Sequence, residues 1–321
     1  MISPLEFILN TQLKLKRSYL GRKTGGFTLI ELLVAMIMAA LVITPLLGFM
    51  LNILETDRKE QAKANTEQEI QSALGYIAQD LQEAVYIYDA DGLNKIKAQL
   101  PPASGTSPGC ATGSNCTPVV VFWKREVKKG VIPVTGAAKT QSDDAVVYSL
   151  VGYYLIKTSD NTWSNKARIG RFQIEDRIKN PKNTVALASN SSAYLGTEKA
   201  ENKGFKMFDS TLSGGITSIM TQWTKGAAAY EAPTRILVDY IDSDSAIGIC
   251  QPTTGQPTVK PIGINGFYAC VVDPAQALAQ VFIKGNATAR FKPDATCDTS
   301  TPGTSCPSVS VQVKGRGSLG L

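Results

Sequence analysis

The sequence predicts an α+β protein, in which one long N-terminal helix precedes a domain of mainly antiparallel strands. Two patterns predict this class. An apolar run over residues 27–53 passes into a segment whose apolar residues recur every three or four positions, the period of a helix. Beyond residue 92, short runs rich in Val, Ile, Tyr and Phe alternate with Ser-, Gly-, Pro- and Thr-rich connections, which is typical of strands and loops.

Composition excludes several function classes. The chain of 321 residues contains no histidine, so it has no Ser-His-Asp or Cys-His nucleophile pair and no histidine-ligated zinc. The formal charge is +6, but residues 1–26 carry five basic residues against Glu6, a net +4, which leaves +2 for residues 27–321. Nucleic-acid binding needs a concentrated basic surface, so we expect no nucleic-acid partner for this nearly neutral body.

The first element is a basic leader, residues 1–26, followed by a candidate membrane helix, residues 27–53. About 20 apolar residues suffice to cross a bilayer, and Glu31 is the only formal charge between Phe27 and Ile53. A secretory signal peptide would have a shorter apolar run and an A-x-A cleavage site. The basic flank predicts that the leader stays cytoplasmic and that the body lies outside.

Glu31 is unusual in such a helix. A carboxylate within a span costs about 2.5–3.5 kcal/mol on insertion scales and usually has a partner. The span contains no cation, but cleavage between Gly26 and Phe27 would create an α-amino group about one helical turn away. In an assembly, this amine of one subunit could meet Glu31 of its neighbour. The alternative is an uncut anchor whose Glu31 faces lipid headgroups.

These residues resemble a known family. The stretch GGFTLIELLVAMIMAALVI, residues 25–43, is similar to the class III signal of type IV pilins and type II secretion pseudopilins. The resemblance implies cleavage after Gly26 by a membrane prepilin peptidase, N-methylation of Phe27 and a role for Glu31 in assembly. It also implies other pilins and an inner-membrane assembly platform as partners. The 26-residue leader is longer than the short leaders common in the family.

The helix is predicted to continue beyond the span. Thr44-Pro45 should kink it or loosen one turn. An apolar stripe then predicts an amphipathic helix over residues 54–90, which ends at Asp89–Gly92 and packs on a sheet of a globular domain, residues 91–321. The stripe consists of Ile70, Leu74, Ile77, Leu81, Val85 and Tyr88.

A finer resemblance concerns the end of this helix. Leu74, Asp80, Leu81 and Ala84 match a leucine–acid–leucine pattern of J-type minor pseudopilins, which are tip components of type II secretion. Residues 27–90 and QALAQVFIKGNATAR, Gln276–Arg290, are also similar to the pseudopilins of hormogonium polysaccharide secretion in filamentous cyanobacteria.

In the body, Val-, Ile-, Tyr- and Phe-rich runs predict eight strands, and a helix is possible near Gly204–Ser213. The predicted strands are Pro118–Trp123, Ala145–Lys157, Arg168–Glu175, Thr184–Ala188, Arg235–Ile241, Phe267–Val272, Leu278–Lys284 and Val309–Lys314.

Six cysteines form three pairs that are local in sequence. Their spacings are not those of zinc knuckles, and an extracytoplasmic body lies in an oxidising compartment, so disulfides are expected and a metal site is the rival. Fifteen connectivities are possible, and the economical choice staples three loops: Cys110 with Cys116, Cys250 with Cys270 and Cys297 with Cys306.

Three further clusters leave alternatives open. Tyr88–Gly92 and Asp239–Ser245 gather carboxylates, which suits either calcium or solvated turns, although no complete EF-hand loop is present. Val121–Gly130 interleaves aromatic and basic residues. It could bind a polyanion, but a strand leaving the core into a charged turn is favoured. No other cofactor is expected.

The N-terminal segment predicts a structural protein and no enzyme, and no nucleophile–base pair stands in a motif. The resemblance implies a minor pseudopilin that primes or caps a periplasmic pseudopilus of a type II secretion-like or type IV pilus-like machine exporting protein or polysaccharide. It would sit in the bacterial inner membrane by a single pass. The alternative is a minor type IV pilin that presents an adhesive or DNA-binding tip.

Overall fold

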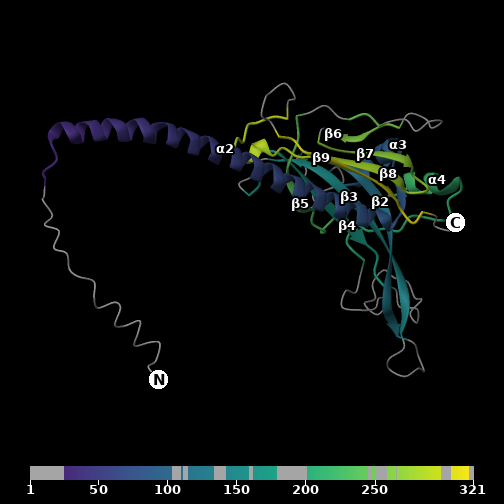
Figure 1. The fold of residues 1–321 in the computed structure, drawn as a ribbon. Coiled ribbons are helices and arrows are strands. Elements are labelled where there is room, and N and C mark those ends of the chain that lie inside the picture. Colours follow the sequence, from purple (N-terminus) through teal and green to yellow (C-terminus); the bar gives the residue numbers. More distant parts are fainter. Residues whose placement is uncertain are drawn as a thin grey trace, which may run out of the picture. The chain divides into compact units, whose positions relative to one another are not determined.

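The computed structural model describes residues 25–102, 110, 115–133, 142–158, 162–178, 201–244, 248–250, 259–264, 266–297 and 305–317. The chain divides into two units, Met1–Glu55 and Thr56–Leu321, and each is described by itself. The predicted α+β class is confirmed, because one long helix, α2 (Leu29–Gln82), precedes a domain built on antiparallel strands (Figure 1).

In the first unit, α2 is an apolar helix without a break. Pro45 lies inside it and removes the N–H that would bond the carbonyl four residues earlier. The Thr44 hydroxyl donates to the Ala40 carbonyl at 2.8 Å, so this turn has a side-chain hydrogen bond. The helix assignment continues through Thr44-Pro45 into the second unit.

The prediction that the helix reaches Tyr88 is wrong, because α2 ends at Gln82 and β1 (Ala84–Ile87) follows. The first four residues of the predicted stripe are buried on α2. Val85 instead lies in β1, which is buried on both faces. The β-branched and aromatic residues of this run favour a strand when a partner strand is available, and β2 supplies that partner.

Five strands form the first sheet in the order β1-β2-β3-β4-β5, and all neighbours are antiparallel. The long strands β2 (Asn115–Pro133) and β3 (Ser142–Lys157) pair over most of their length. The predicted charged turn within Val121–Gly130 is therefore wrong, since this segment stays in β2. β4 (Ala167–Glu175) and β5 (Arg235–Ile241) complete the sheet.

The second sheet has the order β6-β7-β8-β9 and is also antiparallel. Three of its strands confirm predicted runs, whereas the short β6 was not predicted. The predicted strand Thr184–Ala188 lies outside the described residues. The strands are β6 (Ile262–Ile264), β7 (Phe267–Asp273), β8 (Leu278–Lys284) and β9 (Ser308–Lys314).

The helix predicted near Gly204–Ser213 is absent from these described residues. Gly204 has a φ of +83°, and the Asp209 carboxylate accepts from both the N–H and the hydroxyl of Thr211, which makes a turn. A helix instead forms just downstream as α4 (Gly215–Thr221). Among the residues that the structure describes, the other helical elements are α3 (Ala90–Ile96) and two 3₁₀ turns, η1 (Lys97–Gln99) and η3 (Thr288–Arg290).

The core of the second unit lies between the C-terminal half of α2 and the two sheets. Ile70, Ile77 and Leu81 of α2 are fully buried, as is Val281 of β8. Gly285 directly follows β8, and a Cβ atom there would stand 2.4 Å from Thr66 of α2. The helix therefore approaches the second sheet so closely that only glycine fits at this point.

Candidate functional site

The predicted processing site lies in an exposed, non-helical stretch immediately before α2. Gly25 to Thr28 have no helical assignment, and all four are exposed. Phe27 is 81% exposed, and the space around Gly25 and Gly26 is open. The peptide bond between Gly26 and Phe27 is thus accessible and outside a helix, as a peptidase substrate must be.

Thr28 caps the first turn of α2 through Glu31. The Glu31 N–H donates to the Thr28 carbonyl at 3.1 Å and to the Thr28 hydroxyl at 3.3 Å. Thr28-Leu29-Ile30-Glu31 has the T-x-x-E spacing of a capping box. This cap was not predicted from the sequence, although the T-x-x-E spacing was present. Glu31 therefore stands in the first turn, where the positive end of the helix dipole favours a carboxylate.

Behind Glu31, the apolar side chains of α2 have no cover in the described chain. Every residue from Leu29 to Leu54 is exposed, and by length and composition this helix can cross a membrane. Exposed apolar surface of this extent marks contact with lipid or with other apolar helices. The segment thus has the properties of a single-helix membrane anchor.

In the second unit, a buried ion cluster fastens the end of α2 to the first sheet. The Asp80 carboxylate accepts from Arg171 Nε at 2.7 Å, Tyr153 Oη at 2.7 Å and Lys124 Nζ at 3.0 Å. Lys124 also pairs with Glu83 at 2.8 Å. The sequence placed Asp80 in a leucine–acid–leucine pattern but did not predict its partners, because they lie 44 to 91 residues away.

The surroundings of Asp80 act on its pKa in opposite directions. Burial alone would raise the pKa, because it penalises the charged form. The hydrogen bond and charge of Arg171, with Tyr153 and Lys124, outweigh burial and hold the pKa below its ordinary value of 3.8. Asp80 is therefore an ionised anchor for α2.

A second polar contact holds α2 at Thr66 and Glu69, on the N-terminal side of Asp80. Arg290 Nε donates to the Thr66 hydroxyl at 2.8 Å, and the Arg290 guanidinium also pairs with Glu69. Arg290 belongs to η3, which follows β8. Polar contacts thus tie the C-terminal half of α2 to the first sheet and to η3.

The six cysteines form three disulfides: Cys110–Cys116, Cys250–Cys270 and Cys297–Cys306. The Cα atoms are 5.9, 5.7 and 5.9 Å apart, within the usual range for a disulfide. These are the pairs that are local in sequence, so each disulfide closes a short loop.

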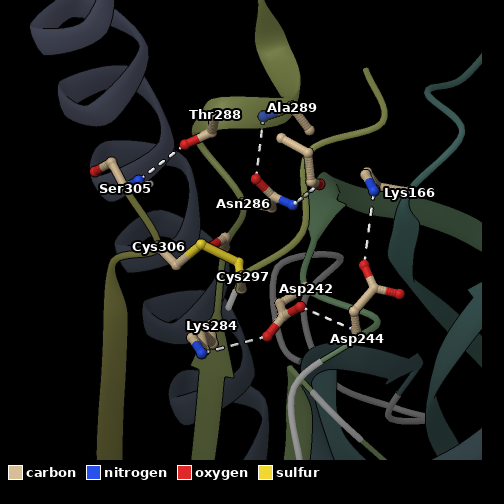
Figure 2. Close-up of a disulfide and its surroundings, with 12 residues drawn as sticks. Lys166, Asp242, Asp244, Lys284, Asn286, Thr288, Ala289, Cys297, Ser305 and Cys306 are labelled. Carbon is tan, nitrogen blue, oxygen red and sulfur yellow. Dashed lines mark hydrogen bonds and ion pairs between the residues drawn. A yellow bond between two sulfur atoms is a disulfide. The ribbon is translucent and has the colours of Figure 1, made fainter. Parts of the chain in front are cut away.

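Figure 2 shows the Cys297–Cys306 disulfide close to two hydrogen bonds of the segment that follows β8. The Asn286 side chain accepts from the Ala289 N–H at 3.0 Å. The Ser305 N–H donates to the Thr288 hydroxyl at 2.8 Å. The disulfide therefore joins the segment after β8 to the segment that leads into β9.

The first acidic cluster left open for calcium, Tyr88–Gly92, has a structural use. The Asp89 carboxylate caps α3 by accepting from the Gly92 N–H at 2.8 Å, and Asp91 pairs with Lys260 at 3.0 Å. Both carboxylates therefore have partners from the protein.

The carboxylates of the second cluster, Asp239–Ser245, also have protein partners, and Ser245 lies outside the described residues. Within the described part of the chain, no group of three or more acidic or cysteine side chains is arranged to hold a metal ion. The Ser164 hydroxyl donates to Asp239 at 2.8 Å. Lys284 pairs with Asp242 at 3.4 Å and Lys166 with Asp244 at 3.6 Å (Figure 2).

The aromatic and basic residues of Val121–Gly130 do not share one surface. Phe122 and Trp123 are fully buried, while Lys124 pairs with Asp80 and Lys128 with Glu126. The rings thus belong to the core, and these two lysines are already ion-paired.

Comparison with known proteins bears on the N-terminal segment. Residues 21–47 match the family model of the prokaryotic N-terminal methylation motif, a stretch that contains Gly26, Phe27 and Glu31. No curated protein and no solved structure is significantly similar to the chain. The motif implies processing by a prepilin peptidase and assembly with other pilins, and the family is structural. The methylation motif, together with the long helix that it heads and the antiparallel β domain that follows, supports a type IV pilin-like protein.

Proposed function

We propose that the chain is a minor pseudopilin that primes or caps a periplasmic pseudopilus of a type II secretion-like or type IV pilus-like machine. The observation that carries the proposal is the uncovered apolar helix headed by the methylation motif. In this proposal, residues 1–26 are a removable leader, residues 27–53 are the membrane and assembly helix, and the body lies outside the inner membrane.

The proposed mechanism starts with cleavage between Gly26 and Phe27. The new α-amino group, once methylated, stands beside the first turn of α2, where the helix dipole is already positive. Glu31 of a neighbouring subunit supplies the opposite charge. This pair fixes the axial register between neighbouring helices, and their apolar side chains exchange lipid contacts for contacts with one another. An inner-membrane assembly platform delivers the subunit.

An end position is proposed because of the size of the body. Two sheets, a long β2–β3 pair and three disulfide-closed loops follow the helix. A shaft repeats one subunit at short intervals, so a body this elaborate would crowd it, whereas a filament end has room. Disulfides also fit a periplasmic location, which is oxidising. No catalytic role is proposed.

The test combines processing with stoichiometry in the native cell. Intact mass of the membrane-extracted protein should correspond to residues 27–321 with a methylated N-terminus. Quantitative mass spectrometry of sheared filaments should find far fewer copies of the protein than of the shaft subunit. Deletion of the protein should reduce the number of filaments. A protein that retains Met1–Gly26 would contradict the pilin mechanism. Normal filament number with lost adhesion or DNA uptake would favour the alternative, a ligand-binding tip pilin.

A further inference from the structure

Two exposed aromatic side chains of the body lie in one groove. The large apolar side chains exposed in the described part of residues 56–321 are Tyr76, Val127, Val146, Trp163 and Ile249. The two aromatic ones, Tyr76 at 46% and Trp163 at 39% exposure, both line a groove of about 1010 Å³ between α2 and β5, elements labelled in Figure 1. A large aromatic ring that remains exposed in a groove points to a ligand that stacks on it.

Each aromatic ring of this groove has a guanidinium over one face. The arginine carbon to ring-centroid distances are 5.6 Å for Arg171 over Tyr76, 5.9 Å for Arg168 over Trp163 and 4.5 Å for Arg290 over Tyr240. Cation–π contacts of this kind hold a ring in place. The rings are therefore pre-oriented, which lowers the entropy that a ligand must overcome on binding.

Two of these arginines are already neutralised by carboxylates. Arg171 pairs with Asp80, and Arg290 pairs with Glu69. Asp239 adds a further carboxylate to the lining. The groove therefore lacks the excess positive charge that phosphate or another polyanion requires.

The rest of the lining combines polar side chains from α2 and from the segment around Trp163 with the aliphatic residues Ala73, Ile236, Leu237 and Val238. Asn65, Gln68 and Ser72 are exposed on α2 and line the groove together with Ser164. A second hollow of about 550 Å³ also includes Tyr76 and the adjoining part of β5. Amides, hydroxyls and carboxylates beside flat aromatic rings and aliphatic side chains suit a ligand that has both C–H faces and many hydroxyl groups.

We infer that this groove, lined by Tyr76 and Trp163, binds a neutral oligosaccharide. Sugar rings stack their C–H faces on aromatic rings, and their hydroxyls exchange hydrogen bonds with amides and carboxylates. The site does not depend on the proposed place in the filament, because all of its residues belong to the body.

The rival ligand is an extended peptide that adds a strand to β5, which is an edge strand. The geometry of β5 disfavours it. Tyr240 has a φ of +57°, which interrupts an extended strand. The β4–β5 register also shifts twice, and such irregularities make an edge a poor template for pairing.

The test titrates the purified full chain with cellohexaose, maltohexaose and chitohexaose, with a heparin hexasaccharide as the anionic probe. A zwitterionic detergent is needed, since glycoside detergents carry a sugar. Trp123 and Trp223 are buried, so a change in fluorescence reports on Trp163. We expect a neutral probe to bind, and Trp163→Ala or Tyr76→Ala to weaken binding about tenfold by calorimetry. Trp163→Phe should bind within about threefold of wild type.

A blocking variant keeps the test independent of the ring contacts. Ser72→Trp fills the groove from an exposed position and should abolish binding. Gln71→Trp, exposed on α2 but outside the groove lining, should bind like wild type, and so should Val146→Ala. Thermal unfolding checks that each variant is folded. Failure of every neutral probe, binding of the anionic probe alone, or unchanged binding in Ser72→Trp would overturn the inference.

Discussion

Glu31 and Asp80 are carboxylates in two places where a negative charge is costly, and the chain stabilises them differently. Glu31 stands in a helix that suits a membrane, where only the capped first turn of α2 favours it locally. Asp80 is buried in the body and has three donors from the first sheet. The Glu31 carboxylate can still accept a partner from another subunit, whereas the Asp80 carboxylate has its hydrogen-bond donors within its own chain.

Replacing Asp80 should therefore destabilise the body itself. Asp80→Ala leaves Lys124 and Arg171, both largely buried, without their carboxylate. We expect a loss of about 3 kcal/mol in the free energy of unfolding, measured by denaturant titration of the full chain. Glu60→Ala, an exposed acid on the same helix, is the control and should change it by less than about 0.5 kcal/mol. Equal effects would show that the cluster is not an anchor.

The same cluster should give a pH dependence of known sign. The folded pKa of Asp80 lies below its ordinary value of 3.8. The contribution of Asp80 to the free energy of unfolding is therefore complete above that pH and is lost as pH falls through the folded pKa. The difference in unfolding free energy between wild type and Asp80→Asn should thus be constant at neutral pH and shrink below about pH 3.8. A difference that stays constant down to about pH 2 would contradict this assignment.

At the scale of elements, α2 and the second sheet meet with no space between them. A Cβ atom at Gly285 would stand 2.4 Å from Thr66 and 3.3 Å from Ile70. Thr66 cannot simply rotate away, because its hydroxyl donates to the Ala62 carbonyl and accepts from Arg290. The position of this glycine thus sets how closely the helix packs.

Gly285→Ala should separate the two elements and cost about 1–3 kcal/mol in the free energy of unfolding. Gly75→Ala is the matched control, because Gly75 lies on α2 with no atom near its Cβ direction. That variant should be stabilised by about 0.5–1 kcal/mol, since alanine favours a helix over glycine. Denaturant titration of both variants checks the prediction. A neutral Gly285→Ala would mean that α2 can shift without loss.

Much of the element order could be predicted from sequence, because periodicity is local. Arg235–Ile241 and Leu278–Lys284 were predicted with the bounds that the structure has. The end of α2 was not, since Val85 and Tyr88 fit a helical stripe and a strand equally well, and pairing with β2 decides between them. The partners of Asp80 and the groove between α2 and β5 depend on long-range contacts, which no local pattern contains.

At the scale of the whole molecule, the disulfides bear on the cellular compartment in which the body lies. Closing a longer loop removes more entropy from the unfolded chain, and the sequence separations are 20 for Cys250–Cys270 and 6 for Cys110–Cys116. Replacing the first pair with serines should cost about 3 kcal/mol and the second about 2 kcal/mol. Thermal unfolding ranks the variants, and non-reducing peptide mapping of native material checks the pairing. Free thiols throughout would contradict an extracytoplasmic body.

The filament role depends most directly on Glu31, and two variants separate the charge of its side chain from a local role in the first turn of α2. Glutamine can take the N3 position of a capping box but carries no charge, whereas alanine has neither the charge nor a side chain that can accept a hydrogen bond at N3. If the carboxylate pairs with the Phe27 amine of a neighbour, Glu31→Gln and Glu31→Ala should be equally defective in assembly. Both should still insert, because removing a charge makes insertion easier, and both should be cleaved, because Gly26 is unchanged.

The measurement is photo-crosslinking from Ile37, in the middle of the span, to other pilin-like subunits in native membranes, beside a count of assembled filaments. Leu33→Ala controls for a general change in the helix surface and should crosslink like wild type. A subunit at a filament end pairs on one side only, so we expect crosslinks to fall strongly but not to vanish. If Glu31→Gln crosslinks and assembles like wild type while Glu31→Ala does not, Glu31 serves as a local cap. The charge pair between subunits would then be the wrong explanation for the carboxylate.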